Sequence, residues 1–378
     1  MIWTKKSRIT ALTLAFGLIA GCGSAPPAAQ RTPTQSRLPV VDSGTLDNAP
    51  YRVDIPANWN GGLVMLLHGY EPKGVPRTTP WPQNEAAPIF LSQGYAVAAS
   101  AYASQGWSVA DAVPDNERLR SYFEGKYGDS RRTYLVGFSL GGHIALASLE
   151  NYGSLYDGAL SLCGVNTPAA SAFNDAVLPS LVAFDYFFPG VMGLASGGLS
   201  DPASPAMLDP EAIESALKAN EQAAGILSRR LEIARAALPG ALMLNYMVLR
   251  EMQARTGGFP ADNRATVYSG FGDDAAFNKA VRRYSGDQNA MKYLADHADL
   301  TGRVGKPLVL QSNNDDPTIP KRLTTIYPAL AAAAGRSDRV VVLPSAGEGH
   351  CGFAPEQIRS AFETLISWVD SGYRPAGP

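Results

Sequence analysis

The sequence predicts an α/β fold, in which a mostly parallel sheet is flanked by helices. Short apolar runs such as 63–67 have the length and continuity of strands that are buried on both faces. Helical patterns alternate with these runs, first over residues 51–165 and again over residues 305–370. A sizeable core is possible, because 46% of the 378 residues are hydrophobic.

The expected elements follow in order along the chain. Apolar runs rich in β-branched and aromatic residues mark the strands, and apolar residues at helical spacing mark the helices. The expected strands are 51–55, 63–67, 95–102, 132–138, 158–163, 307–311 and 339–343. The expected helices are 86–93, 110–126, 140–150, 321–334 and 355–369.

This alternation stops between residues 166 and 300, where helical stretches occupy 209–237, 240–256 and 288–298. Long insertions in compact folds are commonly active-site lids. We therefore expect a large, mainly helical cap inserted between two strands of a core made of residues 49–165 and 301–378. The alternative is a separate domain with its own function.

The N-terminus has the pattern of an export signal. Basic residues precede an apolar stretch at 9–20, which is too short for an ordinary membrane-spanning helix. We interpret 1–21 as a signal peptide. Its end resembles the lipobox of bacterial lipoproteins, so Cys22 is the expected lipidation site and the protein is expected to be exported and lipid-anchored to a bacterial membrane. The alternative is a plain secretory signal. Residues 22–48 are expected to form a flexible tether.

Charge and motifs exclude several classes of function. The formal net charge is -2 and only 17% of residues are charged, so the sequence shows no footprint of nucleic-acid binding. It also lacks an HExxH helix, a CxxC pair, a P-loop and a dinucleotide fingerprint. We therefore expect no cofactor and no metal, and no protein partner is indicated.

A serine between glycines interrupts the passage from the fourth expected strand to its helix. The segment Gly137–Gly141 matches G-x-S-x-G, and its required context of strand, sharp turn and helix is present. Such a turn exposes the hydroxyl of Ser139 as a nucleophile. The amide of Leu140, the residue after the nucleophile, is the first candidate donor to an oxyanion.

A serine hydroxyl needs a histidine to take its proton and a carboxylate to orient that histidine. Four histidines are available. His68 lies in a turn, His143 lies one helical turn beyond the serine, and His297 lies in the expected cap. His350 follows the last expected strand in a glycine-rich loop, so elimination and position favour it as the base.

The carboxylate should follow a strand between the serine and the histidine. Asp315 and Asp316 both follow the strand expected at 307–311. Each could instead be an ordinary turn or N-cap residue, since aspartate favours both positions.

Four segments of the sequence resemble motifs of the α/β-hydrolase superfamily. They are HGY at 68–70, GFSLGG at 137–142, DDPTIP at 315–320 and GEGHCGF at 347–353, and the chain order serine, aspartate, histidine is that of the superfamily. More loosely, the pattern is similar to secreted feruloyl esterases and tannases, and to single-domain relatives of the prolyl oligopeptidases. The resemblance implies the α/β-hydrolase fold and a serine esterase.

Two site residues rest on this resemblance. In the superfamily a D-P-x-x-P loop carries the acid on its aspartate, which selects Asp316. The residue after the HG turn supplies the second oxyanion donor, which points to the amide of Tyr70, although its phenol could donate instead. The alternative is that Tyr70 only lines the pocket.

The substrate is expected to be a small-molecule ester of an apolar or aromatic acid. Tyr102 and Trp107 follow a strand end and should border the pocket, and Phe184 and Phe187 in the cap are candidates for an acyl or aryl site. The alternative for the two phenylalanines is the cap's own core. Two other functions stay open: a serine peptidase or amidase with the same triad, and a non-catalytic surface lipoprotein that retains the fold for binding.

The superfamily's strand order would bring Cys163 and Cys351 to the same end of the sheet, where they could form a disulfide. Some feruloyl esterases and tannases join their serine and histidine loops in this way, but their cysteine adjoins the serine, whereas residue 138 here is Phe. The alternative is two buried free thiols.

Overall fold

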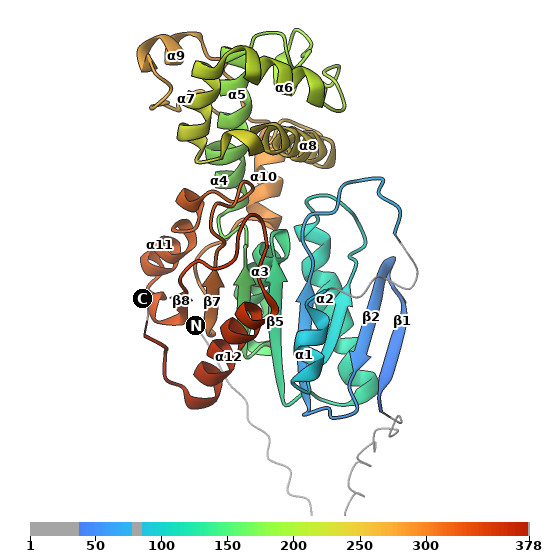
Figure 1. Cartoon of the computed structure of the whole chain (residues 1–378). Helices are drawn as coiled ribbons and strands as arrows, with labels where there is room; N and C mark the ends of the chain where they lie inside the picture. Colours follow the sequence, from blue (N-terminus) through green and yellow to red (C-terminus); the bar gives the residue numbers. More distant parts are fainter. Residues whose placement is uncertain (1–37, 78–84, 377–378) are drawn as a thin grey trace, which may run out of the picture. The chain divides into compact units, whose positions relative to one another are not determined.

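The computed structural model describes residues 38–77 and 85–376. The predicted signal peptide, Cys22 and the first part of the predicted tether lie outside the described residues. One sheet runs through the described part in the order β1-β2-β4-β3-β5-β6-β7-β8 (Figure 1). Its strands are β1 (Val40–Leu46), β2 (Ala49–Ile55), β3 (Gly62–Leu67), β4 (Ala96–Ser100), β5 (Arg132–Phe138), β6 (Gly158–Leu162), β7 (Leu308–Gln311) and β8 (Val340–Val342).

Strands β3 to β8 pair in parallel, whereas β1 and β2 are antiparallel to their neighbours. The register sets Phe138 at the end of β5 opposite Leu162 of β6, and Leu162 opposite Gln311 of β7. The loops that follow these three strands therefore start at the same edge of the sheet, where ligands bind in open α/β sheets.

The expected tether is wrong over its last part, because Val40–Leu46 form the edge strand β1. The turn into β2 consists of Asp47 and Asn48, both with positive φ (46° and 68°). Asp and Asn tolerate this conformation, which a two-residue hairpin turn requires. The carboxylate of Asp42 fixes β1 to the core by accepting hydrogen bonds from Tyr122, Tyr127 and Lys126.

Helices cover both faces of the sheet, as the continuous apolar strands predict. In β3, Leu63, Met65 and Leu67 belong to the apolar cluster on one face, and Val64 and Leu66 belong to the cluster on the other. Helices α2, α3 and α11 pack on the first face, and α1 and α12 on the second. The core helices are α1 (Ala87–Ser92), α2 (Val109–Tyr127), α3 (Leu140–Tyr152), η1 (Gly153–Leu155), η5 (Lys321–Leu323), α11 (Ile326–Ala333), η6 (Ser337–Arg339) and α12 (Pro355–Ser371).

The chain between β6 and β7 forms a mainly helical cap, which shares one apolar cluster with the first face of the sheet. Its helices are α4 (Ala169–Ser171), the π-helix η2 (Ala172–Val177), α5 (Leu178–Phe187), η3 (Gly198–Ser200), α6 (Pro210–Ala219), α7 (Glu221–Leu231), η4 (Arg235–Ala237), α8 (Leu238–Thr256), α9 (Asp274–Ala280) and α10 (Gln288–His297). Helix α5 was not predicted from the sequence. The run Leu178–Phe184 is buried throughout, so it has no polar face to give a helical period.

Two further findings concern residues 38–77 and 85–376 only. No helix there is long and apolar enough to cross a membrane. No group of three or more His, Cys, Asp or Glu side chains there could hold a metal ion.

Candidate active site

A strained turn presents the hydroxyl of Ser139 between β5 and α3. Ser139 has φ 55° and ψ -123°, a backbone conformation that residues other than glycine rarely adopt. The flanking glycines are required by close packing. A Cβ on Gly137 would lie 2.0 Å from the carbonyl oxygen of Gly141, and a Cβ on Gly141 would lie 2.2 Å from that of Leu67. The turn can therefore be this sharp only without those side chains.

Three predicted residues meet in one hydrogen-bonded chain. The Oγ of Ser139 lies 2.8 Å from Nε2 of His350. The Nδ1 of His350 lies 2.9 Å from Oδ2 and 3.1 Å from Oδ1 of Asp316. The Asp316 carboxylate is buried and its Oδ1 also accepts the N–H groups of Thr318 and Ile319, at 2.8 and 3.0 Å. The structure thus brings Asp316, not Asp315, to the histidine.

The three other histidines are placed elsewhere. Nδ1 of His68 lies 2.8 Å from the carbonyl oxygen of Gly69, and burial lowers the pKa of His68 to about 4. Both nitrogens of His143 face backbone carbonyls. His297 is exposed beside Tyr293 in the cap.

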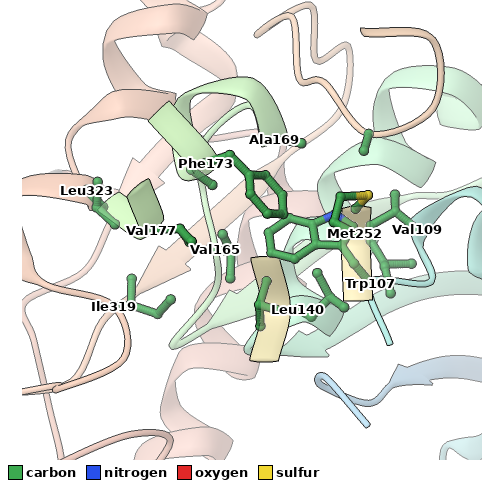
Figure 2. Packing of buried hydrophobic residues seen from close by; sticks show 14 of the residues in the cluster. Trp107, Val109, Leu140, Val165, Ala169, Phe173, Val177, Met252, Ile319 and Leu323 are labelled. Atoms are coloured by element: carbon green, nitrogen blue, oxygen red, sulfur yellow. The ribbon is translucent and has the colours of Figure 1, made fainter. Parts of the chain in front are cut away.

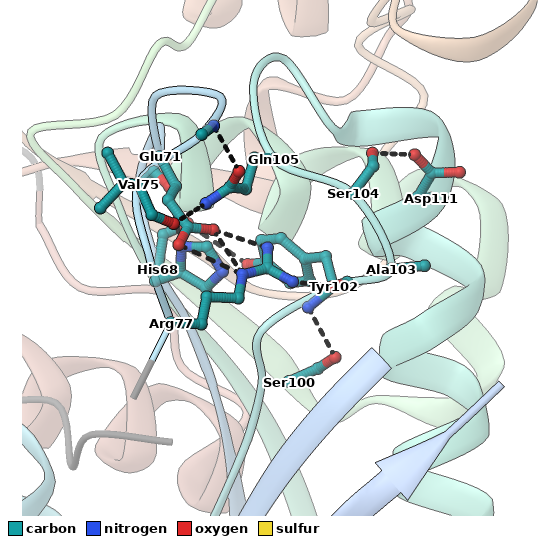
Figure 3. A network of polar contacts seen from close by, with 12 residues as sticks. His68, Glu71, Val75, Arg77, Ser100, Tyr102, Ala103, Ser104, Gln105 and Asp111 are labelled. Atoms are coloured by element: carbon teal, nitrogen blue, oxygen red, sulfur yellow. Dashed lines mark hydrogen bonds and ion pairs between the residues drawn. The ribbon is translucent and has the colours of Figure 1, made fainter. Parts of the chain in front are cut away.

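Tyr102 does not border the cavity, contrary to the expectation. Its side chain is fully buried, its ring stacks on His68 at 4.1 Å, and its hydroxyl donates to the His68 carbonyl at 3.3 Å (Figure 3). The backbone turns at Tyr102 with φ 57°, which directs the ring inward. Arg77 closes this network: it donates to the Tyr102 carbonyl and pairs with Glu71 (Figure 3).

A cavity of about 440 Å³ opens beside Ser139 and His350. Trp107 lies in its wall, as expected. None of the described residues that line it is Asp, Glu, Lys or Arg. In the view of Figure 2, Val165 and Val177 lie between Ile319 and Leu323 on one side and Trp107 and Leu140 on the other. The lining residues are Gly69, Tyr70, Pro72, Trp107, Phe138, Ser139, Leu140, Val165, Ala172, Ala176, Val177, Leu244, Asn245, Met247, Val248, Thr318, Ile319, Leu323, His350 and Cys351.

The two cap phenylalanines do not line this cavity, so their role as a substrate site is wrong. Phe184 is fully buried and stacks on Phe188 at 4.9 Å. Phe187 packs near Phe277 at 6.0 Å, within the cap's own core. The cap wall comes instead from the π-helix η2 and from α8. No pattern in the sequence shows which face of an inserted helix turns toward the core, so these residues were missed.

Two candidate oxyanion donors border the cavity. Leu140 is the first residue of α3, so its N–H has no acceptor within the helix. The Tyr70 hydroxyl is buried and has no hydrogen-bond partner among the residues placed in the structure. Burial raises the pKa of Tyr70, which keeps the phenol protonated. Three roles for Tyr70 therefore stay open: its amide donates to the oxyanion, its phenol donates, or it only lines the pocket.

A disulfide joins Cys163 to Cys351, with their Cα atoms 5.2 Å apart. Cys163 follows β6 and Cys351 follows the histidine directly. The N–H of Cys351 also donates to Oδ1 of Asn313 at 2.9 Å. The loop that carries His350 is thus fastened to the ends of β6 and β7.

Comparison with known proteins finds a relative of low sequence identity. No family model matches the chain. Over 128 residues the sequence is 28% identical to an o-phthalyl amidase from Xanthobacter agilis. The match covers 32% of this chain and 26% of the amidase, so it spans about a quarter of that relative.

Solved structures align with this chain at low sequence identity and at TM-scores below 0.5. A putative lipase from Acinetobacter baumannii aligns with TM-score 0.41 and 13% identity over 89% of this chain and 93% of the lipase. A carboxyl esterase from Bacillus coagulans aligns with TM-score 0.43 and 14% identity over 88% of this chain and 98% of the esterase. The acylaminoacyl peptidase of Pyrococcus horikoshii aligns with TM-score 0.46 and 12% identity over 88% of this chain but only 41% of the peptidase.

The structure has the α/β-hydrolase fold. Its mostly parallel sheet is flanked by helices, the serine stands on a strand-to-helix elbow, and serine, aspartate and histidine follow in the order of that fold.

Proposed function

We propose that the protein is a serine hydrolase that cleaves carboxylic esters through an acyl-enzyme on Ser139. One observation carries the proposal: the hydrogen-bonded chain Ser139–His350–Asp316 ends at an uncharged, mostly apolar cavity. A hydroxyl, an imidazole and a carboxylate in this order are the parts that activate a serine.

The mechanism follows from these contacts. Ser139 Oγ attacks the ester carbonyl carbon as its proton passes to Nε2 of His350. Asp316 holds the Nδ1–H and stabilises the imidazolium that forms. When the tetrahedral intermediate collapses, the carbon–oxygen bond of the ester breaks and His350 returns the proton to the leaving alcohol. Water, activated by the same histidine, then attacks the acyl-enzyme and releases the acid.

The developing oxyanion needs donors that are already in place. The N–H of Leu140 is the first, and Tyr70 supplies the second through its amide or its hydroxyl. Each such donor lowers the barrier by about 3–4 kcal/mol in the measured precedent.

The cavity favours an apolar or aromatic acid as the acyl part. A charged substrate group there would lose its hydration without gaining an opposite charge, because no Asp, Glu, Lys or Arg belongs to the described lining. Small p-nitrophenyl esters of increasing acyl size should be hydrolysed, while a succinyl monoester should not.

Amide hydrolysis is the second candidate, and the sequence similarity to the o-phthalyl amidase favours it. Assaying p-nitrophenyl esters beside the matching p-nitroanilides separates the two. A fluorophosphonate probe tests both at once: if Ser139 is not labelled, the protein is not a serine hydrolase and the fold serves binding.

We propose in addition that the protein is exported and lipid-anchored through Cys22. A disulfide between Cys163 and Cys351 supports an oxidising compartment. Replacing Cys22 by Ser should release the protein from membranes. A wild-type protein that washes off membranes without detergent would refute the anchor.

A further inference from the structure

A fully buried imidazole touches both ends of the cap insertion. His143 lies in α3, one helical turn after Ser139, and is 0% exposed. Its Nδ1 lies 3.0 Å from the carbonyl oxygen of Val165, and its Nε2 lies 2.7 Å from that of Ala298. Val165 is where the chain leaves β6 for the cap, and Ala298 ends α10, where the chain returns to the core.

The region around His143 and Val165 is linked to the cavity by three contacts. The Val165 N–H donates to the carbonyl oxygen of Ser139 at 3.2 Å, and the Val165 side chain lines the cavity. The Trp107 ring meets His143 edge to face at 5.9 Å. The two ends of the cap are also joined to each other, because the Asp299 carboxylate accepts the N–H of Ala170 at 2.9 Å.

We propose that His143 is a positioning residue that fastens the two ends of the cap to the nucleophile helix, through the packing of its ring and through one N–H that the Val165 and Ala298 carbonyls share. It thereby holds the cap wall of the cavity, η2 and α8, at a set distance from Ser139. The attachment itself does not depend on the proposed hydrolase function; its kinetic consequence does.

The protonation of His143 decides how the two contacts are made. Burial lowers the pKa of His143, against the hydrogen bonds to Val165 and Ala298 and the nearby carboxylates of Asp299 and Glu150, which raise it. A neutral imidazole carries one N–H, so only one of the two carbonyls accepts a hydrogen bond at a time. Variants that keep a donor at one position are therefore informative.

Three substitutions test the attachment by amide hydrogen exchange. In His143→Asn the side-chain nitrogen falls near the Nδ1 position and can donate to Val165. In His143→Gln it falls near Nε2 and can donate to Ala298. His143→Leu keeps the volume and donates to neither.

We expect His143→Leu to speed exchange in both 163–172 and 294–302, by less than about tenfold in each, because the two segments share the effect of one lost hydrogen bond. His143→Asn should speed mainly the second segment and His143→Gln mainly the first. Exchange in β5 should not change, and His297→Gln, at an exposed position, is the matched control. The proposal is overturned if the Asn and Gln variants each speed exchange equally in the two segments, or if exchange in β5 also becomes faster.

Kinetics supply a second readout. In the Asn and Gln variants the KM for a bulky aryl ester should rise by about tenfold, because the cap wall is less well placed, whereas kcat for an acetyl ester should stay within about threefold. An equal fall in kcat for both esters with KM unchanged would contradict a role in placing the wall. Absence of fluorophosphonate labelling in the wild type would end the hydrolase proposal and leave the exchange result standing.

Discussion

The core and the cap contribute different things to the same cavity. The core supplies every member of the hydrogen-bonded chain, namely Ser139, His350 and Asp316. The described cap residues that line the cavity are aliphatic, alanine or methionine side chains apart from Asn245. If the proposed function holds, we expect the core to set the reaction and the cap to set the choice of substrate.

The two regions also differ in how they are held. The serine turn is fixed by local packing of glycines, whereas α8 of the cap is fixed by buried polar contacts with a core loop. The Glu251 carboxylate accepts the N–H of Trp107 at 2.9 Å, and Arg255 donates to the carbonyl of Gln105 at 2.6 Å. A Cβ on Gly106 would lie 2.4 Å from the Glu251 carboxylate, so only glycine allows this approach.

The largest effect should come from the core. Ser139→Ala should lower kcat by about 10⁶-fold, since the nucleophile is lost. His350→Ala should cost about as much, and the double variant should lose little more, because the two groups act as one unit. Steady-state hydrolysis of a p-nitrophenyl ester measures this, with circular dichroism to verify folding. Losses that multiply in the double variant would contradict a shared mechanism.

The second largest loss of kcat is expected from the carboxylate that orients the histidine. Asp316→Asn should lower kcat by about 10⁴-fold, because an amide no longer holds the histidine in the correct tautomer. Asp315→Asn is the matched control and should change kcat only a few-fold, since Asp315 serves a turn with φ 47°. If the two variants exchange their effects, the acid is the neighbouring residue.

These core residues could be predicted because their signals are local. The elbow needs glycines at fixed positions around Ser139. The apolar strand at 307–311 points to the loop of Asp315 and Asp316, and the resemblance of the D-P-x-x-P segment then selects Asp316. The pocket residues could not be predicted in the same way. Phe184 and Phe187 are as apolar as a substrate site requires, but Phe184 is buried within the cap and the half-buried Phe187 packs against the same cluster, away from the cavity. The strand β1 was missed because its turn residues, Asp47 and Asn48, are as common in flexible segments as in hairpins.

The disulfide joins the end of β6 to the loop that carries His350, both in the core, so breaking it should affect the core more than the cap. Cys163→Ala, Cys351→Ala and the double variant should each lower the free energy of unfolding by about 2–4 kcal/mol. All three should be alike, because any one substitution removes the same bond. Denaturant unfolding measures the loss. Additive losses in the double variant, or two free thiols in the unreduced wild type, would show that the bond does not form.

The smallest effect should be a change in selectivity from the cap. Ala176 of η2 lines the cavity and is partly exposed, so a larger side chain there can extend into the space without overpacking the core. Ala176→Phe should lower kcat/KM for a bulky aryl ester by about 10–100-fold, the range over which a few carbon atoms discriminate in an apolar pocket. The acetyl ester should be hydrolysed at nearly the wild-type rate, because Ser139 and His350 are untouched. Ala275→Phe, the same change on the exposed side of the cap helix α9, is the matched control and should alter neither ester. An equal loss for both esters in Ala176→Phe would mean that the cap acts on the reaction itself, and the division of labour between core and cap would be wrong.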